Sequence, residues 1–484
     1  MSTVIVRRYA CLLAPDSARV LLRPFVPAAA LVSSIVGRIL DASEEDIRHE
    51  LDRVLTSFST RHHNLEAVLL SHYELVSAAI ADGSSLTRAR QLLIGAHFSG
   101  EYALESAALF NPSMVPHPDQ TGVCPGDVRF IMSLRATGEG HISSIEFRSG
   151  VLTAQNSIDL DPSTRFVSAP EVTRNPTYHK NPFIMKLHEM DCDESVSTRV
   201  MSSLAERFTL DQLQQSLRSL VDSGAPPDSG LQHTLTCIQW LADSNYEIRF
   251  SPHLAINERT IFPVSENESN GIEDARFVRF INDDASAIYY ATYTAFNGHT
   301  ILPQLMATED FLTFRILTLN GGAVQNKGMA LFPRMLAGRY AMLARQDDEN
   351  ICIMFSDNLH YWEDAHVLMR PQENWESVKI GNCGSPIETE AGWLVITHGV
   401  GPMRTYCIGA ALLDLDDPTQ VIGRLRSPLI APIGLGREGY VPNVVYSCGG
   451  LLHGTDLILP YAMSDRETAM ASIDLNALLT ALQS

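Results

Sequence analysis

The chain has 484 residues, 45% of them apolar and 19% charged, which is the balance of a folded protein with a large core. Its formal net charge of −20 argues against nucleic acid as a partner, because most of the surface would repel phosphates. The sequence has no run of eighteen apolar residues and no signal pattern near its start, so we expect a cytoplasmic protein without a membrane partner.

The cysteines and histidines give no metal pattern. Eight cysteines are scattered through the chain without the paired spacing of a zinc site, so we expect reduced thiols and no disulfide. His62 and His63 are adjacent, but no carboxylate or cysteine stands at ligand spacing from them. We interpret this pair as part of a solvated loop between helices and predict no structural metal.

Residues 1–100 are predicted to form an extended arm followed by a helical extension. Residues 1–40 alternate apolar and polar side chains, which is typical of an arm or of edge strands. From Ser43 the apolar spacing becomes helical, and Ser43 with the acids after it is a typical helix cap. A second helix is expected over Leu65–Ala81, and Ser84 or Ser85 would cap a third.

The next two segments differ in their periodicity. In residues 101–150, strand patterns at 129–135 and 142–147 flank Gly138-Glu139-Gly140, which predicts a hairpin rather than a phosphate loop because no helical pattern follows. Residues 151–245 carry helical spacing at 195–204 and 210–221, with an apolar stripe that would pack against the main domain. This insertion could also form a subunit interface or shape the leaving-group side of a pocket.

Residues 246–484 are short strands separated by Gly, Pro, Asn and Asp, with almost no helical period. This pattern indicates an all-β sandwich, barrel or propeller. Aromatic-bounded blocks recur at roughly forty to fifty residues, a period that fits a propeller of four-stranded blades.

The motif Gly271-Ile272-Glu273-Asp274-Ala275-Arg276 lies on a turn just before the strand pattern 277–280. A second strand, 290–296, ends in the turn-forming pair Asn297-Gly298. The motif predicts a carboxylate at the rim of a sheet, although an isolated match of this kind is more often a solvated ion pair.

Further blocks along the chain each deliver a polar or charged group at a strand end. They are Phe110-Asn111-Pro112-Ser113, the segment 133–145, Asn326-Lys327-Gly328, Leu343-Ala344-Arg345, Lys379-Ile380-Gly381, Ile396-Thr397-His398-Gly399, and the segment 411–418. In order and spacing these blocks resemble glycoside hydrolase family 130, the family of β-mannoside phosphorylases and mannosidases. The resemblance runs from about Asn326 to Asp465, includes 271–298 and is fainter upstream.

The resemblance implies a five-bladed β-propeller. Residues 101–150 would form the first blade and residues 246–484 the remaining blades, with the helical insertion 151–245 between them. The inner strands of a propeller converge on one funnel, so groups far apart in sequence would meet there.

Within this funnel, the resemblance implies that Asp274 is the general acid, acting on the bridging oxygen through a hydroxyl of the bound mannose. Four basic residues correspond to the phosphate-binding positions: Lys327, Arg345, Lys379 and His398. Substrate binding would fall to Asn111, Arg135, Asp465 and Tyr293, together with Glu273 and Arg276 beside the acid. The family pattern is not matched at Ala275, Gly328 and Ala344, which leaves the acceptor preference open.

The implied activity is inverting phosphorolysis of β-mannoside oligosaccharides to α-mannose 1-phosphate, with inorganic phosphate as co-substrate and no metal or organic cofactor. One alternative is a phosphate-independent β-mannosidase, which would have to recruit Glu388 or Glu438 as a base. Another is a non-catalytic carbohydrate-binding propeller. Linkage, reducing-end sugar, physiological direction and oligomeric state stay open, although apolar faces on the helical segments would suit a homo-oligomer.

Overall fold

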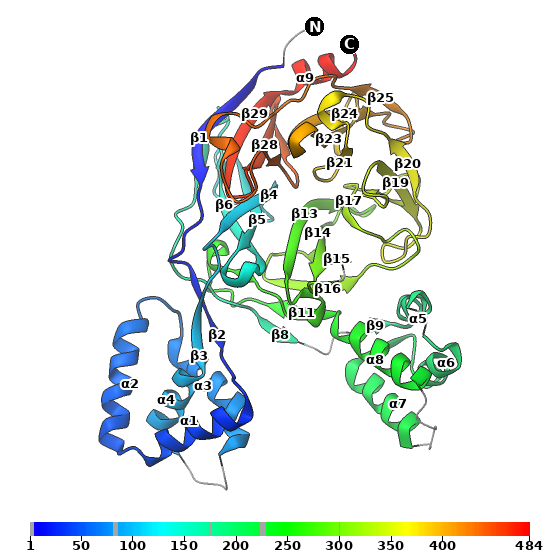
Figure 1. The fold of residues 1–484 in the computed structure, drawn as a ribbon. Coiled ribbons are helices and arrows are strands. Elements are labelled where there is room, and N and C mark those ends of the chain that lie inside the picture. The colour runs from blue at the N-terminus through cyan, green and yellow to red at the C-terminus, as the bar shows by residue number, and fades with distance from the viewer. Residues whose placement is uncertain (1–3, 81–85, 174–176, 191, 223–228, 300) are drawn as a thin grey trace.

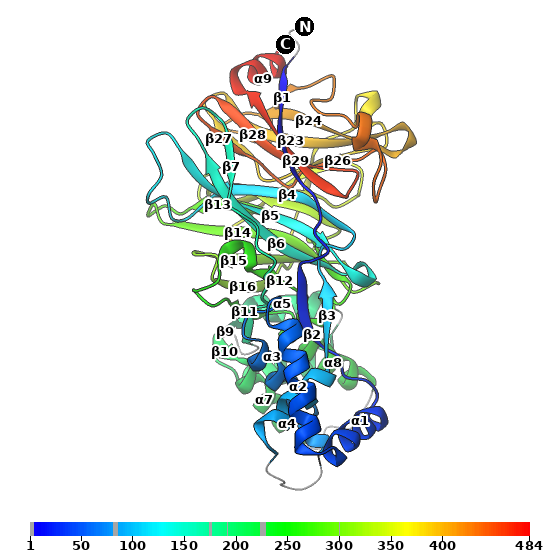
Figure 2. The same cartoon turned by 90° about the vertical axis from the view of Figure 1, so that its left-hand side faces the viewer.

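The computed structural model describes residues 4–80, 86–173, 177–190, 192–222, 229–299 and 301–484. Its main body is built of β-sheets, and two groups of helices project from the same side of that body (Figures 1 and 2). The prediction of a mostly β-sheet structure is confirmed. Within the described ranges, no helix has the length and apolar character needed to cross a membrane.

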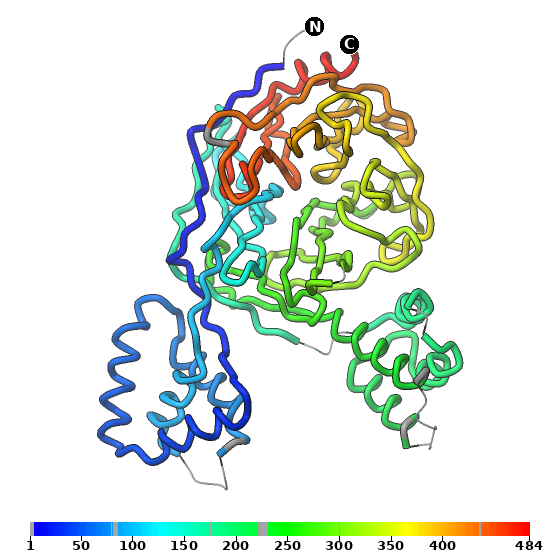
Figure 3. The backbone as a smooth tube through the Cα atoms, viewed as in Figure 1, coloured from blue at the N-terminus to red at the C-terminus, as the bar shows by residue number. Residues whose placement is uncertain are grey.

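The N-terminal arm is extended, as predicted, and ties the beginning of the chain to its end. Strand β1 (Val6–Leu13) pairs antiparallel with β29 (Glu467–Asp474), which leads into α9 (Leu475–Leu482). The chain then runs along the outside of the body (Figure 3) to β2 (Val20–Pro24), which pairs with β3 (Ser99–Ala103). The β2–β3 ribbon connects the body to the first helical group.

Helix α1 (Ala29–Asp41) corrects the extended structure predicted for the whole of residues 1–40. Its buried residues Val32, Val36 and Ile39 have helical spacing, but Ala28 at its start offers no capping side chain to mark the helix in the sequence. Helix α2 (Glu44–Phe58) starts as predicted, because the Ser43 hydroxyl accepts a hydrogen bond from the backbone N–H of Asp46.

The first helical group is completed by α3 (Leu65–Val76), the short η1 (Ser77–Ala79) and α4 (Arg88–His97). The predicted helix end at Ala81 and the predicted caps Ser84 and Ser85 lie outside the described residues. The side chain that caps α4 is Thr87, which accepts from the backbone N–H of Arg90.

Five antiparallel meanders follow one another along the chain and around the body. The first is β4 (Ala108–Pro116), β5 (Val128–Thr137) and β6 (Ser143–Leu152), with β7 (Ile158–Leu160) and β12 (Thr260–Ile261) paired to β6. The second is β13 (Gly271–Ile281), β14 (Ala287–Phe296), β15 (Ile301–Thr308) and β16 (Thr313–Thr318), with β11 (Tyr246–Arg249) and β8 (Glu171–Thr173) at its far edge. The predicted hairpin at 138–140 is confirmed and contains η2 (Glu139–His141).

The remaining meanders complete the body. The third is β17 (Lys327–Leu331), β18 (Tyr340–Arg345), β19 (Ile351–Ser356) and β20 (His366–Met369). The fourth is β21 (Lys379–Asn382), β22 (Ile387–Thr389), β23 (Gly392–Gly401), β24 (Thr405–Leu413) and β25 (Val421–Arg424). The fifth is β26 (Val445–Tyr446), β27 (Leu451–His453), β28 (Asp456–Met463) and β29, with β1 at its edge.

Each meander shares an apolar cluster with the next, and the fifth shares one with the first. Representative buried pairs are Phe147 with Phe277, Phe280 with Met342, Ile353 with Trp393, Leu394 with Leu459, and Ile458 with Met132. The first two meanders are also joined through a single parallel pair, Ser143 with Gly271. Side-chain packing rather than continuous hydrogen bonding therefore holds the meanders in a ring (Figure 1).

The helical insertion has its own core. Helices α6 (Glu194–Ser202) and α7 (Leu210–Asp222) match the predicted segments, and α5 (Lys180–Glu189), α8 (Ser229–Asp243) and the small sheet β9 (Thr177–His179) and β10 (Arg207–Thr209) were not predicted. The predicted stripe packs mainly inside this group, where Val200, Leu213 and Ile238 are fully buried together. Packing of the stripe against the main domain, as the sequence suggested, is therefore not its principal role.

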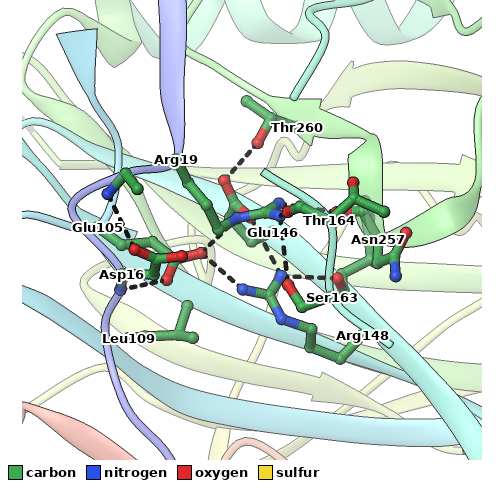
Figure 4. A network of polar contacts seen from close by, with 12 residues as sticks. Asp16, Arg19, Glu105, Leu109, Glu146, Arg148, Ser163, Thr164, Asn257 and Thr260 are labelled. Carbon is green, nitrogen blue, oxygen red and sulfur yellow. Dashed lines mark hydrogen bonds and ion pairs between the residues drawn. The ribbon is translucent and has the colours of Figure 1, made fainter. Parts of the chain in front are cut away.

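A fully buried ionic network links the N-terminal arm to the first meander (Figure 4). Arg19 Nε lies 2.8 Å from Glu105 Oε1 and Arg19 Nη2 lies 2.6 Å from Glu146 Oε2. Arg148 contacts the same two carboxylates, at 2.6 and 3.2 Å. Thr260 donates a further hydrogen bond to Glu146 at 2.7 Å. The two cations face two carboxyl groups, and burial and the charge of Glu146 raise the pKa of Glu105 to about 7 even so, which shows how closely the network depends on both arginines.

Removing one cation should therefore destabilise the whole junction. In Arg148→Met, Glu105 and Glu146 share a single arginine, and we expect a loss of about 3–5 kcal/mol in the free energy of unfolding, measured by urea denaturation. The control is Arg53→Ala, which breaks the exposed Arg53–Glu50 pair and should leave the urea midpoint unchanged. A loss below about 1 kcal/mol for Arg148→Met would show that the network is not required for stability.

Candidate active site

One pocket gathers side chains from all five meanders. Its lining residues are Asn111 and Arg135 from the first, Asp274 and Arg276 from the second, Lys327 and Arg345 from the third, His398, Arg404 and Tyr406 from the fourth, and Val441, Val444, Tyr446 and Asp465 from the fifth meander and the loop before it. Nine of the eleven side chains predicted for the site either line this pocket or contact a side chain that lines it. The two exceptions are Lys379 and Tyr293.

Backbone irregularities aim the first two polar side chains into the pocket. The pairing of β4 breaks between Phe110 and Ser113, and the pairing of β13 breaks between Glu273 and Arg276. Asn111 and Asp274 lie in these breaks with positive φ angles of 49° and 54°. A bulge re-aims a side chain that would otherwise alternate with its neighbours, and Asn and Asp tolerate this backbone conformation better than most residues.

Asp274 is held by an amide and two guanidinium groups. Asn111 Nδ2 donates to Asp274 Oδ1 at 2.6 Å, Arg135 Nη1 lies 3.5 Å from the same oxygen, and Arg276 Nη2 lies 3.9 Å from Oδ2. Burial acts to raise the pKa of Asp274, but the surrounding cations outweigh burial and bring that pKa below its ordinary value. The cations, in order of effect, are Arg135, Arg276 and Lys327. In the free protein Asp274 is therefore an ionised carboxylate.

Arg276 is fixed by three acceptors and is almost fully buried. Its Nη2 donates to the Tyr446 hydroxyl at 2.7 Å, its Nε to the backbone oxygen of Cys383 at 3.1 Å, and its Nη1 to the backbone oxygen of Asp274 at 3.0 Å. These contacts join the second, fourth and fifth meanders. Arg276 therefore sets the position of Asp274 and contributes charge to it.

Glu273 faces the same cations from the neighbouring position. Arg135 Nη2 lies 2.8 Å from Glu273 Oε1, and Lys327 Nζ lies 3.6 Å from Glu273 Oε2. Arg135 also donates from Nε to Ser143 Oγ at 2.9 Å. Glu273 is thus committed to two ion pairs and positions Arg135 and Lys327 around Asp274.

Lys327 and Arg345 are direct partners across the β17–β18 pair. Two like charges opposite each other on neighbouring strands repel, so this arrangement favours an anion between or above them. Gly328 follows Lys327 with a φ of 92°, and its left-handed conformation accounts for a glycine at this position.

His398 supports Arg345 and is not itself a cation. Arg345 Nη1 lies 3.0 Å from His398 Nε2 and, because an arginine only donates, that nitrogen accepts. Burial first, and then the charge of Arg345, hold the pKa of His398 well below its ordinary value. Gly381 makes the contact possible, because a Cβ there would lie 2.3 Å from His398 Cε1. The predicted set of four basic residues therefore contains three cations and one neutral acceptor.

Lys379 and Tyr293 are placed differently from the prediction. Lys379 does not line the pocket, and its Nζ lies 2.9 and 3.1 Å from the two carboxylate oxygens of Asp348. Tyr293 is buried in the core of the second meander, where its hydroxyl donates to Glu268 Oε1 at 2.7 Å. Strand alternation turns this ring away from the pocket, so Tyr293 offers it neither a ring face nor a hydroxyl.

Asp465 is the second carboxyl group of the pocket and its protonation differs from that of Asp274. It occupies the turn between β28 and β29 with a φ of 48°, and its Oδ1 is buried without a hydrogen-bond partner among the described residues. Burial first, and then the charge of Asp274, raise the pKa of Asp465 to about 7. Two carboxyl groups with opposed pKa shifts in one pocket are typical of a functional site.

The sequence did not identify Arg404, Tyr406 or Tyr446 as pocket residues. Arg404 ends η6 (Pro402–Arg404), and both Met403 and Arg404 have positive φ angles, of 57° and 54°. The single available signal was for Tyr406, a hydroxyl-bearing ring at the start of an apolar strand shortly after His398. As for metals, no group of three or more His, Cys, Asp or Glu side chains suited to an ion occurs in the described part of the chain.

The pocket is lined mainly by charged and polar side chains contributed by all five meanders, a lining suited to a polar, partly anionic ligand. The sequence profile of a family described as β-1,4-mannooligosaccharide phosphorylase matches residues 239–484. The chain therefore belongs to glycoside hydrolase family 130. Asn111 and Arg135 lie before the matched region.

Named relatives agree with this assignment. A 1,2-β-oligomannan phosphorylase of a Thermoanaerobacter species is 35% identical over 222 residues, which cover 44% of this chain and 71% of the relative. A β-1,2-mannobiose phosphorylase of Listeria innocua is 33% identical over 232 residues, covering 46% and 63%. A β-1,4-mannooligosaccharide phosphorylase of Ruminococcus albus is 30% identical over 237 residues, covering 45% and 69%.

A solved structure of the Listeria innocua β-1,2-mannobiose phosphorylase with β-1,2-mannobiose is also similar. It has 22% sequence identity and a TM-score of 0.46, over 78% of this chain and 92% of that one.

The raised pKa of Asp465 predicts a pH-dependent stability. Between the ordinary value of 3.8 and about 7, folded Asp465 keeps a proton that the unfolded chain releases, so its contribution to stability falls as pH rises through this range. An asparagine side chain at this position cannot ionise, so a variant that carries one lacks this loss. We therefore expect Asp465→Asn to gain in Tm relative to the wild type between about pH 4.5 and pH 8.

Thermal melts at both pH values measure this difference. Asp357→Asn, which changes an exposed carboxylate outside the pocket, serves as the matched control. A Tm difference between Asp465→Asn and the wild type that is the same at both pH values would contradict a raised pKa at Asp465.

Proposed function

We propose that this protein is an inverting β-mannoside phosphorylase, and that its five meanders are the blades of a five-bladed β-propeller. The named relatives of 35%, 33% and 30% identity are all β-mannan or β-mannoside phosphorylases. The propeller is supported by the apolar clusters between consecutive meanders and by the packing of the fifth meander on the first. The helical extension and the helical insertion are additions to these blades.

The observation that carries the reaction type is the cross-strand pair of Lys327 and Arg345 beside Asp274. A hydrolase needs an ionised carboxylate as a base for water, whereas phosphate is already an anionic nucleophile and needs cations to hold it. In the described lining of the pocket, Asp274 and Asp465 are the two carboxyl groups, and burial keeps Asp465 protonated below about pH 7.

The carboxylates that a mannosidase would have to recruit lie elsewhere. Glu388 is paired with Arg334 at 2.7 Å on a different part of the surface, and Glu438 is exposed in the loop before the fifth meander. Glu273 is near Asp274, but it is engaged in ion pairs with Arg135 and Lys327. This distribution favours phosphorolysis over phosphate-independent hydrolysis.

In the proposed reaction, a phosphate oxygen attacks the anomeric carbon of the mannosyl unit as the bond to the leaving sugar breaks. The proton on Asp274 passes to the leaving oxygen, and the proton that phosphate loses restores Asp274 for the next turnover. The products are α-mannose 1-phosphate and the shortened sugar, so atoms and charges balance. Phosphate enters as co-substrate, and these steps require no metal or organic cofactor.

Asp274 must gain a proton before it can act as an acid, and we propose that phosphate binding causes this protonation. Its pKa is low in the free protein because Arg135, Arg276 and Lys327 stabilise the carboxylate. A phosphate anion on Lys327 and Arg345 offsets part of this positive charge and so raises the pKa of Asp274. The acid is thereby prepared when the nucleophile is in place.

The mannosyl unit would lie between Asn111, Arg135 and Asp465, whose amide, guanidinium and protonated carboxyl groups match sugar hydroxyls. We propose β-1,2-linked mannosides as the first substrates to test, because the relatives with 35% and 33% identity are named for β-1,2-linked substrates. A cytoplasmic location and a homo-oligomer formed through the helical segments are further expectations of this proposal.

Product analysis tests the function directly. With β-1,2-mannobiose and inorganic phosphate we expect mannose 1-phosphate, and without phosphate we expect no cleavage. β-1,4-Mannobiose under the same conditions reports linkage preference. Free mannose formed equally well without phosphate would show that the protein is a mannosidase and not a phosphorylase. Absence of product from every mannoside would favour the carbohydrate-binding alternative.

Replacing the acid tests the role of Asp274. Asp274→Asn keeps the size of the side chain but removes its proton, so we expect kcat for phosphorolysis to fall roughly 100- to 10,000-fold. Glu388→Gln, outside the pocket, is the matched control and should retain wild-type turnover. Turnover of Asp274→Asn within a few-fold of the wild type would exclude Asp274 as the proton donor.

A further inference from the structure

The carboxylate of Asp348 contacts Arg345, which the proposed function assigns to phosphate, and Lys379, which only the family resemblance assigns to phosphate. Asp348 lies in the turn between β18 and β19, and its carboxylate contacts Lys379 Nζ at 2.9 and 3.1 Å and Arg345 Nη2 at 3.3 Å. Arg345 lines the pocket, whereas Lys379 does not. The carboxylate thus sits where the third and fourth meanders meet, beside the pocket.

The turn holds this carboxylate in place. Asp348 has a φ of 59°, a left-handed conformation that Asp adopts more readily than most residues with a side chain. Its neighbour Asp347 fixes the turn, because Asp347 Oδ1 accepts from the backbone N–H groups of Glu349 and Asn350 at 3.0 and 2.8 Å. The turn therefore fixes the backbone position from which the Asp348 side chain extends, and the contacts with Lys379 and Arg345 hold its carboxylate.

The charge of Asp348 persists across the working pH range. Burial acts to raise its pKa, but the hydrogen bond from Lys379 and the charges of Arg345, Lys379 and Lys327 bring that pKa below its ordinary value. An ionised carboxylate and a phosphate oxygen make the same kind of charge-assisted hydrogen bond to a lysine. For Lys379 to bind phosphate, its contacts with Asp348 must be broken or shared.

We propose that Asp348 is an affinity-determining residue for phosphate: it occupies Lys379 and part of Arg345 in the free protein, and phosphate must compete with it. This inference rests on the proposed function, because it takes the anion that enters the pocket to be phosphate. Asp348 lowers the phosphate affinity of the site and in return keeps Lys379 and Arg345 paired when the pocket is empty.

Asp348→Asn is the test, because it keeps the shape of the side chain and asparagine tolerates a positive φ. Since Asp348 is half exposed, its ion pairs are weak, and we expect roughly a two- to five-fold lower Kd for inorganic phosphate, measured by calorimetry on the full chain. The KM for phosphate at saturating β-1,2-mannobiose should fall by a similar factor. General damage to the site would raise KM or lower kcat, so a gain in affinity is not explained by a structural role.

Glu349→Gln is the matched control. It removes one negative charge from the same exposed turn, and no hydrogen bond or ion pair joins its side chain to Lys379 or Arg345. Its phosphate Kd should equal that of the wild type. An equal gain in phosphate affinity from both variants would show that the effect comes from the overall negative charge of the turn and not from the contacts of Asp348. That result would overturn the proposal.

A double-mutant comparison shows whether Asp348 acts through Lys379. In a Lys379→Met background, Asp348→Asn should improve phosphate binding by clearly less than it does when Lys379 is present. An undiminished gain would overturn the proposed competition for Lys379. Asp348→Gly, which suits the positive φ, is the second variant if Asp348→Asn does not fold.

The outcomes separate this inference from the proposed function. Phosphate binding to the wild type with no gain, or with a loss, in Asp348→Asn overturns the role of Asp348 and leaves the phosphorylase intact. Failure of both folded proteins to bind inorganic phosphate overturns the phosphate site and the inference together.

Discussion

The contacts of Arg276 are the constraint on which the rest of the pocket depends. One guanidinium group joins three meanders through the Tyr446 hydroxyl and the backbone oxygens of Cys383 and Asp274. A buried arginine that loses such acceptors is costly, so the sheets must keep the spacing that satisfies it. That spacing in turn brings Asp274 within reach of Asn111 and Arg135, and it fixes the width of the pocket that these side chains line.

Matching of buried charges recurs through the molecule and explains how a chain of net charge −20 maintains a cationic pocket. In the network around Arg19, two arginines face two glutamates in equal number, which suits a junction that only holds parts together. In the pocket, Lys327 and Arg345 face each other, and Glu273 and Asp348 compensate them only in part. Incomplete compensation leaves positive charge in the pocket, which is the basis of the proposed phosphate site.

Signals between neighbouring residues were sufficient for much of the fold. The Ser43 cap, the hairpin at 138–140 and the strand after Asp274 were all predicted, because each depends on a few adjacent side chains. Helix α1 was missed since its start at Ala28 carries no capping side chain. The pairing of β1 with β29 joins segments more than four hundred residues apart, and no local pattern specifies such a partner.

For the site, the sequence by itself determined the chemistry that is available: a carboxylate in the motif around Asp274 and basic residues at Lys327, Arg345 and Lys379. The tertiary structure decided which groups meet and in what state. It turned Tyr293 into the core, brought in Tyr446, left His398 neutral beside Arg345, and placed Asp348 on Lys379. The physical reason is that pKa values and contacts depend on burial and on charges a few ångströms away, and these neighbours come from distant strands.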